Sequence, residues 1–244
     1  MAATRSRAAT AQKIDELMER ASRALAETRY FECERLALEA LDLAHASHDY
    51  DRMARLLLPL QEARRQKRLA AIDTGKLYRI SELPSATRKL KPGCYLIEPP
   101  LVGADGRDLR DRANQQEVPV FIVVREPKTR LGDWPIVMIG PVTVRTKVEP
   151  PEKEEAPDIA WMIEAAEALG EEALSTVDPQ ADIFEQVEQL LDRLGTVTEH
   201  EKLHQALEAA CREAAAEVAR SGLPTDRHAP KDDDELDLES DDDM

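Results

Sequence analysis

The chain has 244 residues, of which 42% are apolar, 4% aromatic and 34% charged, and its formal net charge is −16. This apolar share excludes a wholly disordered protein, and no apolar run approaches the roughly 20 residues that a membrane-spanning helix needs. The first ten residues lack the apolar stretch of a secretory signal, and the three cysteines form no paired pattern. We therefore expect a cytoplasmic protein with no membrane partner.

The charge is unevenly distributed along the chain. Residues 1–150 carry 26 basic and 21 acidic side chains, whereas residues 151–244 carry 7 basic and 28 acidic ones. The overall net charge of −16 argues against nucleic acid as the main partner, because phosphate neutralisation requires a concentrated cationic surface. The acidic half is expected either to attract a basic partner or to fold back onto the basic half.

One compact basic run stands out in the first half of the chain. It consists of Arg64, Arg65, Lys67 and Arg68, with no aromatic residue among them. Cations in the last turns of a helix complement the helix dipole, so we expect a solvated helix end that a partner protein can reach.

Residues 11–72 read as a helical region that follows a flexible N-terminus at 1–10. Ile14, Leu17, Ala21 and Leu25 recur at the spacing of one apolar helical face. Two more helices follow, and Pro59 is expected to kink or break the third because it lacks a backbone N–H.

The second and third of these helices resemble each other at a shift of 20 residues. Residues 30–38 and 50–58 both begin with a tyrosine, Tyr30 or Tyr50, followed three positions later by an apolar residue, Cys33 or Met53. This pattern resembles the second helix of a tetratricopeptide repeat, although that repeat recurs at about 34 residues. The resemblance implies a helical-hairpin layer that binds protein segments beside Tyr30 and Tyr50. An ordinary three-helix bundle explains the same periodicity.

Residues 73–149 change to short β-branched runs bounded by proline, glycine and aspartate. Strands are expected at residues 76–80, 93–98, 118–125, 134–139 and 142–148. Their short connections predict a small antiparallel sheet or barrel. Residues 104–117, half of which are charged, are expected to form an exposed loop.

Residues 150–157 form a proline-rich charged linker, and residues 158–222 return to helical periodicity. We expect three helices there: the first ended by Gly170, the second begun at Asp178, and the third running from Thr198 to Arg220. Residues 223–244 are expected to be a disordered acidic tail that attracts a basic partner. Its densest acidic run is Asp232, Asp233, Asp234 and Glu235.

The segment His200-Glu-Lys-Leu-His204 fits the HExxH pattern of zinc peptidases. Its resemblance to that family implies His200 and His204 as zinc ligands and Glu201 as general base. Lys202 at a central position and the absence of a third ligand on a separate downstream helix speak against the resemblance. A structural histidine pair on a helix flank is the favoured interpretation.

The sequence therefore predicts an α+β protein with an N-terminal helical layer, a small β domain, C-terminal helices and an acidic tail. We expect a non-enzymatic interaction or scaffold protein without a cofactor, whose partner is another protein, with the acidic tail favouring a basic one. Two alternatives remain: a zinc-dependent metallopeptidase, and a subunit of a homo-oligomer in which the long helix that ends near Arg220 packs against its copy.

Overall fold

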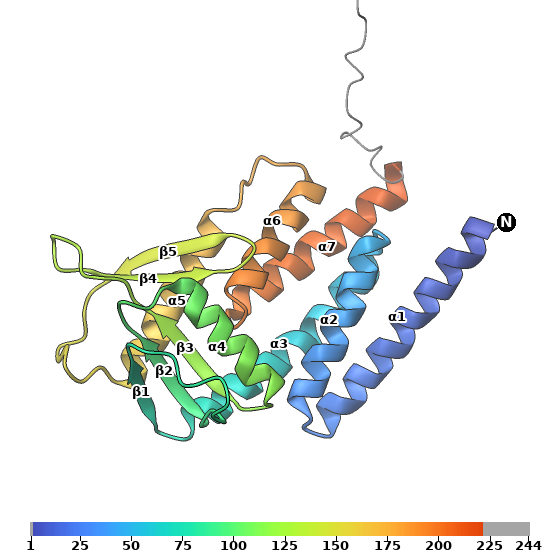
Figure 1. Ribbon diagram of the computed structural model, residues 1–244. Coiled ribbons are helices and arrows are strands. Elements are labelled where there is room, and N and C mark those ends of the chain that lie inside the picture. Colours follow the sequence, from blue (N-terminus) through green and yellow to red (C-terminus); the bar gives the residue numbers. More distant parts are fainter. Residues whose placement is uncertain (1, 222–244) are drawn as a thin grey trace, which may run out of the picture.

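The computed structural model describes residues 2–221, with side chains from residue 8 onward (Figure 1). In this part of the chain, three helices precede two strands, a helix and three further strands, and three helices follow. The fold class is α+β, as the sequence predicts. The predicted tail, with Asp232 to Glu235, lies outside the described residues.

The N-terminal layer consists of α1 (Ala2–Ala26), α2 (Tyr30–Ala46) and α3 (Tyr50–Ile72). Both turns between them contain a residue with positive φ, Thr28 at 59° and His48 at 53°, and the Asp49 side chain caps α3 by accepting from the Arg52 N–H. Helix α1 includes most of the segment for which the sequence predicts a flexible N-terminus. The expected break at Pro59 is absent, because α3 continues through it.

The first three strands pair in parallel, which corrects the predicted antiparallel sheet. Strands β1 (Leu77–Ile80), β2 (Gly93–Ile97) and β3 (Val120–Val124) lie in the order β1-β2-β3, with Leu77 opposite Cys94 and Cys94 opposite Phe121. Strands β2 and β3 are buried along their whole length. Continuous apolar runs of this kind are typical of parallel strands covered on both faces.

The connection that the sequence predicts to be a loop is helix α4 (Gly103–Gln115). This helix joins β2 to β3, as parallel pairing requires. It packs on the sheet through a narrow face of small residues. A Cβ atom at Gly106 would lie 2.4 Å from Cγ2 of Val124, so only glycine allows this approach. The buried face consists of Gly103, Gly106, Leu109 and Ala113.

Strands β4 (Trp134–Ile139) and β5 (Thr143–Val148) form an antiparallel hairpin, with Trp134 opposite Val148. A single antiparallel bridge between Arg125 and Ile136 connects this hairpin to β3. All five strands lie within two residues of their predicted positions. Only their pairing differs from the prediction.

The C-terminal region contains α5 (Ile159–Ser175), α6 (Ile183–Thr196) and α7 (Glu201–Ser221). Gly170 lies inside α5 rather than at its end, and Asp182 rather than Asp178 caps α6. Helix α5 packs on β5, while α7 lies between α3 and α6 (Figure 1). The two helical regions therefore share one core. None of the helices within residues 2–221 has the length and apolarity needed to cross a membrane.

Candidate binding groove

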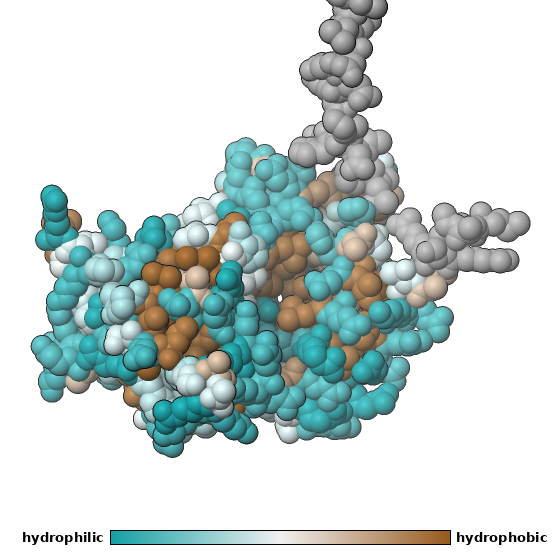
Figure 2. Space-filling model, viewed as in Figure 1, coloured by the Kyte–Doolittle hydropathy of each residue, from teal (hydrophilic) through white to brown (hydrophobic). Residues whose placement is uncertain are grey.

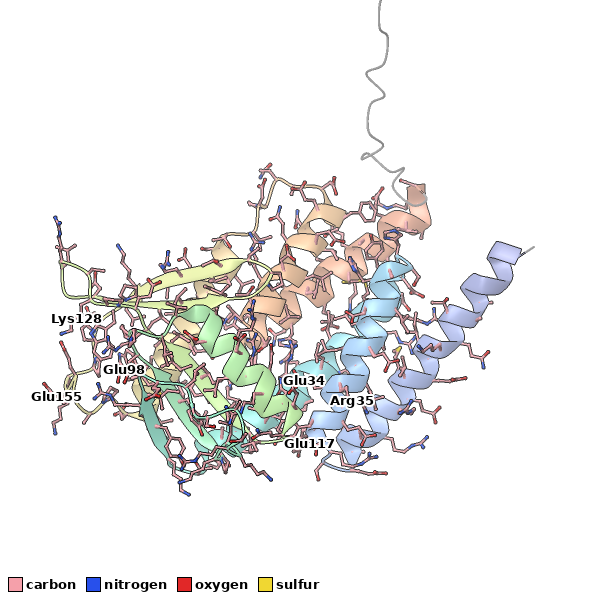
Figure 3. The ribbon with its side chains drawn as sticks, in the orientation of Figure 1. Glu34, Arg35, Glu98, Glu117, Lys128 and Glu155 are labelled. Atoms are coloured by element: carbon pink, nitrogen blue, oxygen red, sulfur yellow. The ribbon has the colours of Figure 1, made fainter. Side chains whose placement is uncertain are left out.

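A buried ion cluster joins α2 to α3 beneath α4. Oε1 of Glu34 accepts a hydrogen bond of 2.8 Å from Nε of Arg64, and Lys67 donates to the other oxygen of Glu34 and, at 2.6 Å, to Asn114 of α4. Burial disfavours the charged form of Glu34, but Arg64 and Lys67 outweigh burial and lower its pKa to about 2. Figure 3 shows Glu34 at the boundary between α2 and α4, far from Lys128 and Glu155. With two cations and one carboxylate, this cluster carries one surplus positive charge.

The basic run at residues 64–68 is not a solvated helix end, and that expectation is wrong. The Arg64 side chain is 7% exposed, and Arg68 bonds to Glu201 of α7 at 3.0 Å and to Glu167 of α5 at 3.3 Å. Arg65 is more exposed and lies 3.5 Å from the same Glu201 carboxylate. The run therefore connects α3 to the acidic C-terminal helices, which agrees with the expectation that the two halves attract each other.

The two histidines of the HExxH segment face different elements. The buried ring of His204 has Nδ1 3.0 Å from the backbone oxygen of His200 and Nε2 3.3 Å from a guanidinium nitrogen of Arg64. Burial, followed by the Arg64 charge, lowers the pKa of His204 to about 3, so this imidazole is neutral. The bond to the His200 oxygen then places the proton on Nδ1 and makes Nε2 the acceptor from Arg64.

His200 precedes α7 and packs against α5. A Cβ atom at Gly170 would lie 2.2 Å from the His200 ring, and His200 Nε2 is 3.4 Å from Glu167. Within residues 2–221, no three His, Cys, Asp or Glu side chains are grouped so that they could hold a metal ion. The arrangement therefore does not fit the zinc site that the HExxH resemblance implies, and Glu201 is occupied by Arg68 and Arg65 instead.

A polar cavity of about 250 Å³ lies between α2, α3, α4 and the segment that joins α6 to α7. We call it the polar hollow. Among the described residues, Arg110 donates only to the backbone oxygen of Thr196, at 3.1 Å, and to the hydroxyl of Thr198, at 3.2 Å. No carboxylate in the described part of the chain forms an ion pair with Arg110. The lining consists of Glu34, Leu38, Arg64, Lys67, Arg110, Asp111, Asn114, Val120, Gly195, Thr198 and Glu199.

Glu199 is the second unsatisfied charge of the polar hollow. Its carboxylate makes no hydrogen bond or ion pair with any described residue, although its backbone oxygen accepts from Arg68 at 3.4 Å. Burial raises the pKa of Glu199 to about 7, against the opposing charges of Arg110, Lys67 and Arg68. At neutral pH this acid is therefore partly protonated.

An apolar cavity of about 240 Å³ adjoins the polar hollow and shares Leu38, Arg64 and Gly195 with it. We call it the apolar hollow, and the two together the α2–α6 groove. Leu38 of α2 and Leu191 of α6 line it as half-buried side chains, and Figure 2 shows apolar surface inside a depression at this place. The apolar hollow is lined by Leu38, Leu41, Asp42, His45, Leu60, Arg64, Glu188, Leu191, Asp192, Leu194 and Gly195.

The rim of the apolar hollow is acidic. Asp42, Glu188 and Asp192 lie there, and His45 Nε2 contacts Glu188 Oε1 at 2.7 Å between the two helices. This hydrogen bond raises the pKa of His45. The groove thus has an acidic rim on its apolar side and an unpaired arginine on its polar side.

The two tyrosines of the tetratricopeptide resemblance do not line this groove. Tyr50 is buried and packs on Phe184 of α6 with ring centroids 5.4 Å apart, and it lines a separate hollow between α1 and α7. Tyr30 is half-buried at the start of α2. The sequence predicts a groove beside these two tyrosines, and neither of them lines the α2–α6 groove.

Sequence reasoning missed Arg110 and Glu199 as site residues. Arg110 lay in the segment predicted to be a loop, and Glu199 lay beside the HExxH segment without a motif of its own. The sequence offers one signal for Arg110, which is an arginine beside the small residues through which α4 packs on the sheet. This signal can be used only once α4 is recognised as a helix. Comparisons with known protein families, with curated proteins and with solved structures find no match to this chain.

Proposed function

We propose that this protein is a non-enzymatic interaction protein that binds a segment of another protein in the α2–α6 groove. The observation that carries the proposal is the apolar hollow, in which Leu38 and Leu191 from separate helices remain half-buried beside an acidic rim. Half-buried leucines in a concave site provide a place for an apolar side chain of a partner.

The charges around the groove favour a basic partner segment. Asp42, Glu188 and Asp192 lie at the rim of the apolar hollow, and the whole chain has a net charge of −16. Opposite charges at a rim increase the rate of encounter more than the affinity. The acidic residues Asp232, Asp233, Asp234 and Glu235 would add long-range attraction of the same sign.

The resemblance of α2 to a tetratricopeptide helix supports the same class of function, because such helices bind protein segments. The homo-oligomer alternative has less support. The apolar face of α7, on which it depends, packs against α3 and α6 of the same chain. Its buried residues there include Leu203, Leu207 and Cys211.

Selection from a displayed library of random peptides on the full chain tests the proposal. A Leu38→Glu variant serves as the counter-selection target, since Leu38 lines both hollows. Leu58→Glu is the matched control, because Leu58 is 67% exposed on α3 and lines neither hollow. We expect enriched peptides with an apolar residue and basic flanks that bind Leu58→Glu but not Leu38→Glu. No enrichment, or equal binding to both variants, would contradict the proposal.

A further inference from the structure

The cations of the polar hollow are unequally satisfied. Arg64 and Lys67 both pair with Glu34. Arg110 uses only Nη1, which donates to two neutral oxygens of residues 196 and 198. Its Nε and Nη2 have no hydrogen-bond partner among the described residues, and neither belongs to the fully buried unpaired atoms. Arg110 is thus fixed at one nitrogen, and it lines both the polar hollow and a smaller cavity of about 40 Å³.

We propose that the polar hollow is a carboxylate subsite, in which Arg110 holds the side chain of an acidic residue adjacent to the apolar anchor of the bound segment. This inference rests on the proposed function, because the anchor occupies the apolar hollow. The two hollows share Leu38, Arg64 and Gly195, so adjacent residues of one segment can reach both. A guanidinium matches a carboxylate with two parallel hydrogen bonds, which is the contact that the free donors of Arg110 allow.

The polar hollow has three cations and three acids in its lining, and protonation of Glu199 leaves one surplus positive charge. Arg64, Lys67 and Arg110 face it from α3 and α4, against Glu34 of α2, Asp111 of α4 and Glu199. Asp111 is exposed at the edge, and Glu34 is already paired with two cations. Partial protonation of Glu199 at neutral pH reduces the repulsion of a bound carboxylate. The partner segment is therefore expected to have basic residues near the acidic rim and one acidic residue at the Arg110 end.

Capped dipeptides test this subsite on the full chain. Acetyl-Leu-Asp-amide and acetyl-Leu-Asn-amide have nearly the same shape and differ in the carboxylate, and acetyl-Asp-Leu-amide and acetyl-Asn-Leu-amide test the reverse order. Titration followed by amide chemical shifts in nuclear magnetic resonance gives both the affinity and the location. For one of the two orders, we expect the Asp peptide to bind about tenfold more tightly than the Asn peptide, with shifts at groove residues.

Variants of α4 assign the effect to Arg110. Arg110→Gln should abolish the preference for Asp, Arg110→Lys should retain part of it, and Arg107→Gln should leave it unchanged. Arg107 is the matched control because it lies on the same helix, is partly exposed and, among the described residues, forms an ion pair with Asp108 alone. The pattern of amide shifts in the free variants shows directly whether each of them is folded.

Each remaining outcome contradicts the subsite. Equal binding of the Asp and Asn peptides in the groove would overturn the carboxylate contact and leave the proposed function intact. Shifts outside the groove, or none for any peptide with either the full chain or its Leu236→Ser/Leu238→Ser variant, would also overturn it, and the library selection then decides the proposed function separately. The chain itself contains Leu236 next to Asp237, outside the described residues. Binding that appears only after Leu236→Ser and Leu238→Ser would assign the groove to the chain's own tail and overturn the assignment to a partner.

Discussion

The ion cluster around Glu34 and the polar hollow beside it contain similar residues in opposite states. In the cluster, Glu34 is 10% exposed and is bonded to Arg64 and Lys67. In the hollow, Arg110 and Glu199 line the same cavity without forming an ion pair with each other or with another described residue. Buried charges that are paired hold elements together, whereas charges left unpaired beside a cavity are available to a ligand. Within one polar interior, the ion cluster is thus the structural part and the polar hollow is the part for which we propose binding.

The largest expected effect concerns the ion cluster around Glu34. Glu34→Gln would leave Arg64 and Lys67 buried without their carboxylate. We expect a loss of about 3–5 kcal/mol in the free energy of unfolding, the usual cost of removing one partner of a buried pair. Urea denaturation measures it. The control is Glu39→Gln on the same helix, where the carboxylate is exposed and lies 3.4 Å from Lys13. Equal stability of the two variants would show that the cluster is not structural.

The next effect concerns the contact between α5 and His200. Gly170→Ala would place a methyl group 2.2 Å from the imidazole ring, so we expect a loss of about 1–3 kcal/mol in the free energy of unfolding. In a Gly170→Ala/His200→Ala double variant the clash is absent, and the loss should be smaller than the sum of the two single losses. Additive losses in thermal or urea unfolding would contradict the close packing of His200 on α5.

Glu199 of the polar hollow should make the stability of the fold depend on pH near neutrality, which Glu34 of the ion cluster does not. The pKa of Glu199 is about 7 in the folded chain and about 4.3 when unfolded, so its contribution to stability is lost as pH rises through 7. The free energy of unfolding of Glu199→Gln minus that of wild type should therefore be larger at pH 8.5 than at pH 5, by about 1–3 kcal/mol. Urea denaturation across this range measures the difference. Glu213→Gln, at an exposed position of α7, should show no such trend.

The smallest expected effect concerns the acidic residues beyond the described structure. Deletion of residues 231–244 removes nine acids and one lysine. We expect slower association with a basic groove-binding peptide, by severalfold at low salt, and a weaker dependence on salt concentration. Stopped-flow mixing at several salt concentrations measures both. An unchanged salt dependence would mean that the tail has no role in attraction.

The sequence predicts the elements of this fold better than their arrangement. The β-branched runs located all five strands: continuous apolar runs mark β2 and β3, which are buried along their whole length, and alternation marks β5. The parallel pairing of β2 with β3 was missed because their connection contains α4, whose buried face includes Gly103 and Gly106. Glycine there allows close packing, but in a sequence it is typical of a loop.

The candidate site was predictable only in part for a related reason. The basic run at residues 64–68 is visible in the sequence, but its partners Glu34, Glu167, Glu201 and His204 lie about 30 to 140 residues away. Whether a charged run is solvated or buried depends on such distant partners. The sequence therefore predicted attraction between the two halves and its basic side, residues 64–68, but not the acidic partners Glu167 and Glu201.

The most direct test of the central claim is calorimetric titration of a selected peptide into the full chain and its two leucine variants. Leu38→Glu places a charge between the two hollows, whereas Leu58→Glu places the same charge on an exposed position outside them. We predict that Leu38→Glu weakens binding at least tenfold and that Leu58→Glu binds as wild type does. Equal affinities of wild type and Leu38→Glu would contradict binding in the α2–α6 groove.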